Sequence, residues 1–80
     1  MKIFIKVFAS LRRKYPDIND LNPLEIEVKK GIKISEVIFK LGFKIEDIKI
    51  ILLNGEKVSN DEQILEEKSI LSLFPAIGGG

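Results

Sequence analysis

Alternating hydrophobic and charged positions near the start of the chain predict two β-strands. Residues 2–8 place isoleucine or valine at every second position from Ile3 to Val7. Residues 24–28 alternate aliphatic side chains with glutamates in the same way. Because successive side chains of a strand point to opposite faces, each segment has one face suited to a hydrophobic core. The short connection between the two segments favours an antiparallel pair.

That connection predicts a short helix followed by a loop. Ser10 can cap a helix over residues 11–15, because its side-chain oxygen can accept a backbone N–H bond. Pro16 ends that helix. The basic run at residues 12–14 is interpreted as a solvated helix face. Residues 17–23 contain asparagine, aspartate and proline, which are typical of turns and loops.

A second helix is predicted after the second strand. Ser35 is predicted to be its N-cap, and Val37, Ile38 and Leu41 have the spacing of one buried helix face. Gly42 lies where a helix commonly ends on a residue of positive φ. The pattern therefore predicts an amphipathic helix that packs on the apolar face of a sheet.

Two further strands and a turn complete the pattern. Residues 50–53 and 69–74 are mostly hydrophobic, and Asn54-Gly55 is a strong turn signal before a minor strand at residues 56–58. A right-handed crossover brings the last strand beside the first and parallel to it. The sequence therefore predicts an α+β fold of the β-grasp (ubiquitin-like) type, a mixed four- to five-stranded sheet packed on one main helix plus short helices.

Composition narrows the possible functions. The chain has 80 residues, of which 45% are hydrophobic, so we expect one small domain with its own core. No run approaches the ~20 apolar residues of a membrane span, and the N-terminus lacks a signal-peptide pattern. We therefore expect a complete cytoplasmic protein that is monomeric when free and binds no membrane. A net charge of +1 argues against binding to nucleic acid.

Histidine and cysteine are both absent from the chain. Their absence excludes disulfides, zinc sites of the usual Cys/His kind, thiol nucleophiles and imidazole bases. We therefore expect no metal site and no cofactor bound by this chain. Any reacting group must be a carboxylate, an amine, a hydroxyl or a chain terminus.

The C-terminus is the most unusual feature, because residues 78–80 are all glycine. Glycine has no Cβ, so it adds no packing and costs conformational entropy to order. Pro75 fixes φ at the start of a segment that reaches about 20 Å when extended. We predict a domain at 1–74 and a flexible tail at 75–80 that delivers the Gly80 carboxylate into a narrow channel. A frayed end is the alternative, and it is the commoner one in an arbitrary protein.

Three segments resemble a known family. They are residues 8–12 (Phe-Ala-Ser-Leu-Arg), 53–55 (Leu-Asn-Gly) and 73–80 (Leu-Phe-Pro-Ala-Ile-Gly-Gly-Gly). Together with Ile64-Leu65, they are similar to the MoaD/ThiS family of ubiquitin-like sulfur carriers, closest to the small subunit of molybdopterin synthase. The resemblance covers essentially the whole chain.

The sequence departs from the pattern of that subunit at three places. Ala76 replaces the second proline of the ending, Glu66-Glu67-Lys68 replaces an Asp-Gly-Asp turn, and three terminal glycines replace two. The first two departures change local rigidity, and the third bears on whether the tail is used as it stands.

The resemblance implies chemistry at Gly80, with Gly78 and Gly79 forming the tail before it. A ubiquitin-activating-type adenylyltransferase (MoeB/ThiF-like) would adenylate the Gly80 carboxylate with ATP and Mg that it binds itself. A persulfide or sulfide would then convert the adenylate to a thiocarboxylate. As the small subunit of molybdopterin synthase, the chain would donate this sulfur in molybdenum or tungsten cofactor biosynthesis. The large subunit (MoaE-like) would supply the catalytic side chains, so the chain would be no enzyme on its own.

Other roles are open at this point. The chain could be a thiamin-thiazole or tRNA-thiolation sulfur carrier, or a ubiquitin-like modifier conjugated to lysines through Gly80. It could also be a β-grasp binding module whose glycines are inert.

Strand alternation further predicts an apolar outer face on the sheet, opposite the core, where a partner would bind. The residues expected to contact the partner are Phe4, Phe8, Leu52, Ile70, Phe74, Pro75 and Ile77. The alternative is that a loop such as residues 17–23 covers part of this face.

Overall fold

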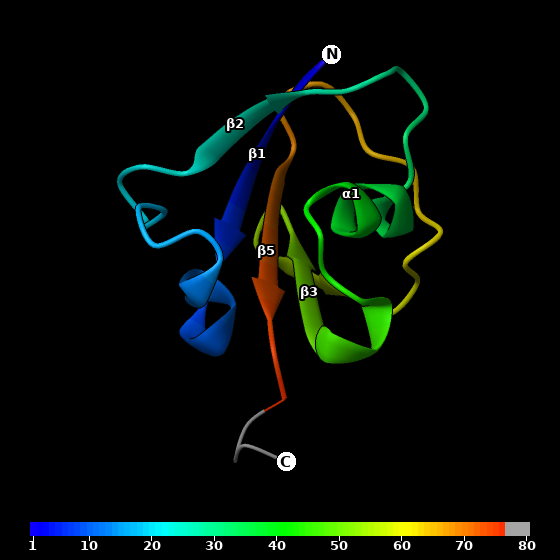
Figure 1. The fold of residues 1–80 in the computed structure, drawn as a ribbon. Helices are drawn as coiled ribbons and strands as arrows, with labels where there is room; N and C mark the ends of the chain where they lie inside the picture. The colour runs from blue at the N-terminus through cyan, green and yellow to red at the C-terminus, as the bar shows by residue number, and fades with distance from the viewer. Residues whose placement is uncertain (77–80) are drawn as a thin grey trace.

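The computed structural model describes residues 1–76 and consists of one mixed sheet with a single α-helix against one face (Figure 1). The strands are β1 (Lys2–Val7), β2 (Leu24–Glu27), β3 (Ile50–Leu53), β4 (Glu56–Val58) and β5 (Ile70–Phe74). The helix is α1 (Ile34–Lys40), and two 3₁₀ turns are η1 (Ala9–Arg13) and η2 (Ile45–Asp47). Four predicted site residues, Ile77, Gly78, Gly79 and Gly80, lie outside the described residues.

The five strands lie in the order β2-β1-β5-β3-β4. β1 and β5 are parallel, with Ile5 opposite Leu71, and the other neighbouring pairs are antiparallel. The chain therefore enters the sheet through a β1–β2 pair, crosses one face through α1 and returns with β5 in the centre. This is the β-grasp topology predicted from the sequence.

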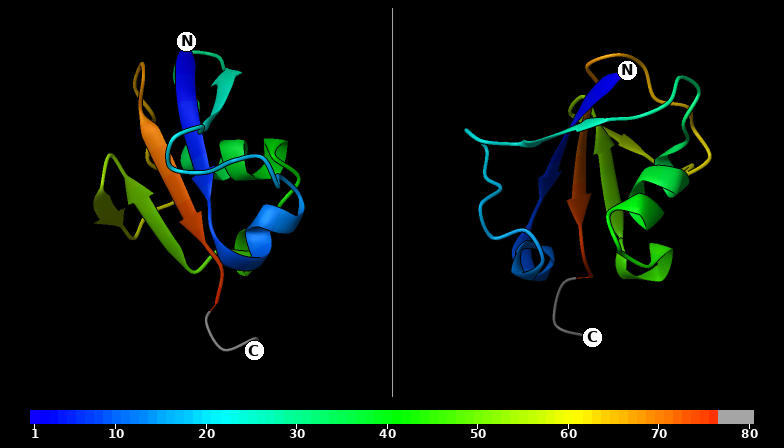
Figure 2. Two further views of the ribbon diagram at one scale, coloured as in Figure 1. Left: turned by 90° about the vertical axis from the view of Figure 1, so that its left-hand side faces the viewer. Right: turned by 45° about the horizontal axis from the view of Figure 1, so that its top comes forward.

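The core lies between the sheet and α1, which is behind the sheet in the left view of Figure 2. The side chains of Ile3, Ile5, Leu71 and Leu73 are fully buried there, and Val37 on α1 meets them. Burial in β1 alternates residue by residue, as the sequence pattern predicts. This alternation turns every other residue of β1 and β5 to the opposite, outer face.

Two local predictions differ from the structure. The first short helix begins at Ala9 and is a 3₁₀ turn. α1 begins earlier than predicted, because its N-cap is Lys33 and not Ser35. The N–H of Lys33 donates to the Glu36 carboxylate at 3.1 Å. A glutamate three residues into the helix therefore satisfies the cap amide and sets the starting point.

The predicted turn between β3 and β4 is confirmed. Asn54 and Gly55 have φ angles of 53° and 85°, as a type I′ hairpin turn requires. Asn54 also ties the hairpin to β5, because its N–H donates to the Ile70 carbonyl and its side-chain oxygen accepts the Ile70 N–H, each at 2.8 Å. Within residues 1–76, no helix is long and apolar enough to cross a membrane.

Candidate functional site

The end of β5 leads into the predicted tail, and an aromatic stack fixes its position. Phe74, the last residue of β5, stacks on Phe8 with 4.3 Å between ring centroids and 6° between ring planes. Phe8 follows β1 directly, and its N–H donates to the Leu73 carbonyl at 3.2 Å. The parallel pairing therefore continues past β1 and brings the two rings together.

Arg12 adds a cation to this stack. Its guanidinium carbon lies 5.3 Å from the centroid of the Phe8 ring, and its Nε donates to the Val7 carbonyl at 3.0 Å. Arg12 is half-buried, whereas Arg13 is exposed. The interpretation of the basic run as a purely solvated face is therefore wrong for Arg12. The short spacing between an aromatic residue and an arginine was the signal that could have indicated this contact.

The chain leaves the sheet after Phe74. The N–H of Lys49 donates to the Phe74 carbonyl at 2.8 Å, so Phe74 is held by the backbone next to β3 as well as by the stack on Phe8. Pro75 is half-buried and Ala76 is exposed. The described chain therefore ends at the surface, at the point where the sequence predicts that the tail begins.

The outer face of the sheet brings together the predicted partner-binding residues that the structure describes. Phe4 lies opposite Ile70 across β1 and β5, and Ile50 lies opposite Phe74 across β3 and β5. Leu52 lies opposite Ser72, so one small polar side chain interrupts the apolar surface. Ile70 is 38% exposed, and the other apolar side chains of this face are half-buried. Because α1 covers the opposite face, these side chains lie on the surface of the molecule.

The loop between η1 and β2 covers part of this outer face, as the alternative interpretation predicted. Asp20 in the loop forms an ion pair with Lys6 of β1 at 3.9 Å, and the loop passes in front of β1 in the left view of Figure 2. The tip of the loop is held by bonds between Asn19 and Asn22, and Leu21 at that tip is 97% exposed. The loop therefore covers Lys6 and adds an exposed apolar residue.

The perturbed titratable groups lie at the start of α1. A hydrogen bond from Lys33 to Glu62 raises the pKa of Lys33, and the backbone hydrogen bond from Lys33 lowers the pKa of Glu36. Within the described part of the chain, no three acidic, histidine or cysteine side chains are placed to hold a metal ion.

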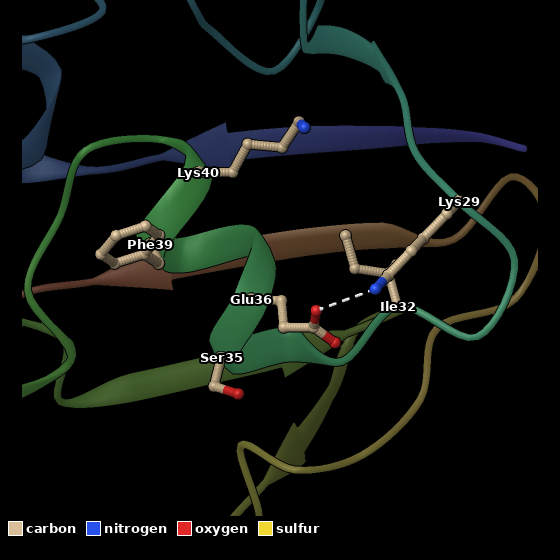
Figure 3. A pocket seen from close by; sticks show the side chains of 6 residues that line it. All are labelled: Lys29, Ile32, Ser35, Glu36, Phe39 and Lys40. Atoms are coloured by element: carbon tan, nitrogen blue, oxygen red, sulfur yellow. Dashed lines mark ion pairs between the residues drawn. The ribbon is translucent and has the colours of Figure 1, made fainter.

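A hollow lies beside α1 (Figure 3). Lys29 and Glu36 extend toward each other across it and form an ion pair at 3.4 Å. Buried Ile32 lies at its base, and Phe39 at its margin is 82% exposed. Because its central charges neutralise each other, this hollow is a weaker candidate for chemistry than the end of β5.

A comparison with protein families shows the family of this chain. The model described as the ThiS family matches residues 5–80, which include the Phe-Ala-Ser-Leu-Arg segment and the terminal glycines. The chain belongs to the ThiS family. Members of this MoaD/ThiS group are small ubiquitin-like sulfur carriers, so the resemblance seen in the sequence is confirmed. No curated protein sequence gives a significant match.

Solved structures support the fold of this ThiS-family chain. A Pyrococcus furiosus protein described as molybdopterin converting factor subunit 1 has a TM-score of 0.73 and 23% identity, covering 96% of this chain and 99% of that one. The small archaeal modifier protein SAMP1 of Haloferax volcanii has a TM-score of 0.74 and 19% identity over 100% of both chains. A complex of molybdopterin-converting factor subunits 1 and 2 from Helicobacter pylori contains a match with a TM-score of 0.63 and 19% identity, again over 100% of both chains.

Proposed function

We propose that this ThiS-family protein is a sulfur carrier whose Gly80 carboxylate is adenylated and then converted to a thiocarboxylate. The observation that carries the proposal is the family match, which runs through the last residue of the chain. The anchoring of Phe74 and the exposure of Ala76 support it, because they place the last described residue at the surface, where a partner can reach it. Gly78 and Gly79 present the carboxylate without side-chain obstruction.

The proposed chemistry has two steps. A Gly80 carboxylate oxygen attacks the α-phosphorus of ATP, and pyrophosphate leaves. Sulfide then attacks the acyl carbon, AMP leaves, and the thiocarboxylate is formed directly. When a persulfide donor attacks instead, AMP leaves and an acyl disulfide forms; a thiol then attacks the donor sulfur, forms a disulfide with it and releases the thiocarboxylate. The carboxylate is a poor acyl donor before activation, which is why adenylation must come first. An activating enzyme of the MoeB/ThiF-like type holds the ATP and Mg, so the carrier brings only the acyl group.

The acceptor that we propose is the pterin precursor of the molybdenum or tungsten cofactor, with this chain as the small subunit of molybdopterin synthase. The names of two structural neighbours support this role, one of them solved as a complex with subunit 2. The apolar outer face around Phe74 and Ile70 is suited to a large-subunit partner. Pro75 and Ile77 would extend this contact toward the channel that takes the tail.

A second candidate function is that of a protein modifier joined to lysines through Gly80. The SAMP1 structure favours it, because that protein is named a small archaeal modifier and matches over the full length of both chains. The modifier shares the first step with the carrier, and a lysine amine then takes the acyl group in place of sulfur. Thiazole and tRNA carriers differ only in the sulfur acceptor.

The test combines the purified chain with the activating enzyme of the same organism, Mg-ATP and sulfide. Intact mass spectrometry of the chain should show replacement of one oxygen by sulfur at Gly80. A variant lacking Gly79 and Gly80 is the control and should gain no sulfur. Absence of any ATP-dependent change at the intact terminus would contradict both functions. Adducts to lysines without sulfur would favour the modifier.

A further inference from the structure

A hollow with charges of both signs surrounds the base of the tail. Arg13 of η1 lies on one side, and Glu46 and Asp47 of η2 with Lys49 lie on the other. Pro75 and Ala76 line the same hollow, so the charged groups surround the last described residues of the chain. The two 3₁₀ turns lie on either side of the end of β5 in Figure 1.

Buried neighbours fix the backbone that carries these charged groups. Leu11 in η1 is buried, and its N–H donates to the Phe8 carbonyl at 3.2 Å. Ile48 after η2 is also buried, and the next residue, Lys49, bonds to Phe74 through its N–H. Both sides of the hollow are therefore attached to the end of β5. The four charged side chains therefore project from fixed backbone positions around the base of the tail.

The four charged side chains are available to a partner. Arg13, Glu46, Asp47 and Lys49 are all exposed, and none belongs to an ion pair among residues 1–76. Two cations and two anions leave no net charge, so the hollow does not act as a general trap for anions. Such a pattern fits a surface with the opposite arrangement and contributes to specificity and association rate more than to affinity.

The position of the hollow indicates which protein partner would contact it. Gly80 lies four residues beyond Ala76, a reach of at most about 14 Å in extended chain. Any enzyme that reacts with the Gly80 carboxylate must therefore bring the entrance of its channel close to Ala76. The activating enzyme is the partner that both candidate functions share, because adenylation comes first in each.

We propose that the hollow formed by Arg13, Glu46, Asp47 and Lys49 docks the charged entrance of the activating enzyme's channel and selects that enzyme. The inference rests on the proposed function. It adds a polar contact, separate from the apolar outer face, that aligns the tail before the reaction. The entrance would carry acidic groups opposite Arg13 and Lys49, and basic groups opposite Glu46 and Asp47.

The test reverses single charges in the hollow and compares them with equal changes elsewhere. Lys49→Glu and Glu46→Lys alter the hollow, while Lys30→Glu and Glu56→Lys make the same charge changes at exposed sites outside it. The readout is ATP–pyrophosphate exchange by the activating enzyme of the same organism, measured against carrier concentration at low and high salt. Thermal unfolding of each variant should match the original chain, because the changed side chains are exposed.

At low salt, we expect each hollow variant to lose roughly tenfold or more in kcat/KM, with kcat at saturation unchanged. High salt should shrink the difference, because it screens exposed charges. Both control variants should stay within about twofold of the original chain. If the hollow variants behave like their controls, or lose only kcat, the inference is wrong while the proposed function stands. If the original chain supports no exchange, the proposed function fails and the inference fails with it.

Discussion

The rings of Phe8 and Phe74 stack 4.3 Å apart at the point where β5 ends. This contact joins the residue after the first strand to the last residue of the last strand. The guanidinium carbon of Arg12 lies over the Phe8 ring, 5.3 Å from its centroid. Because these residues are far apart in sequence, folding of the whole domain is needed before the base of the tail has a defined position.

Replacing Phe74 should therefore affect partner binding more than folding. Phe74→Asp removes half of the stack and places a charge in the apolar outer face, so we expect at least roughly tenfold weaker binding to the large-subunit partner proposed for this face. Leu73→Ala is the matched core variant and should cost about 2–5 kcal/mol of stability, because Leu73 is fully buried. Calorimetric titration and thermal unfolding measure the two effects. Unimpaired association of Phe74→Asp would count against the role of this face.

Removing Gly79 and Gly80 should abolish activation and leave the domain folded. The two glycines have no side chain to bury, and the core is formed by residues of the sheet and α1. Adenylation by the activating enzyme and the thermal unfolding midpoint are the measurements. A large loss of thermal stability in the shortened chain would show that these residues belong to the folded domain, contrary to our account.

Substitutions at Gly55 test whether the positive φ of the hairpin turn requires glycine. Gly55 has a φ of +85°, and a Cβ built on it meets nothing within 4 Å. Gly55→Ala should therefore cost about 1–2 kcal/mol through backbone strain alone. Gly55→Asn should recover part of that loss, because asparagine tolerates positive φ better. Equal stability of the alanine and glycine forms in denaturant titrations would overturn this explanation.

Acidic pH should lower the stability of the start of α1. The pKa of Glu36 in the folded state is lowered below its ordinary value of 4.5, chiefly by the backbone hydrogen bond from Lys33. Its stabilising contribution is therefore complete above pH 4.5 and is lost as the pH falls through the lowered pKa. Glu36→Gln should reduce the change in stability over this range, as followed by unfolding at a series of pH values. An unchanged acid dependence in this variant would contradict the assignment.

Alkaline pH should destabilise the start of α1 through Lys33. Its pKa is raised above 10.5, chiefly by the hydrogen bond to Glu62. The contribution of this pair is complete below pH 10.5 and is lost as the pH rises through the raised pKa. Because both side chains are exposed, the effect should be small and should diminish in high salt. Glu62→Gln should remove it in unfolding experiments at alkaline pH, and a persistent effect in that variant would exclude Glu62 as its cause.

The strands could be predicted from the sequence because burial of one sheet face dictates every second residue. Ile3 and Ile5 in β1 and Leu71 in β5 follow that rule closely. The cap of α1 could not be predicted from Ser35 alone, since the bond from the Lys33 N–H to the Glu36 carboxylate fixes the start of the helix at an earlier residue. Single-residue preferences are weaker than such a paired interaction.

The candidate site could be predicted only in part. Alternation placed Phe4, Ile70 and Phe74 on the outer face correctly, because their strands are regular. The contact of Arg12 with Phe8 depends on the tight 3₁₀ geometry of η1, which residue preferences do not specify. The hollow at the base of the tail combines η1, η2 and the two residues that follow β5, so it exists only in the folded chain.

The most direct test of the account is the mass of the protein isolated from its native host. Fragmentation of the intact chain locates any change to a single residue. We expect a fraction of the molecules to carry sulfur in place of one oxygen on the carboxyl group of Gly80. A population with only ordinary carboxylate, under conditions where the host makes its sulfur-containing cofactors, would contradict the account.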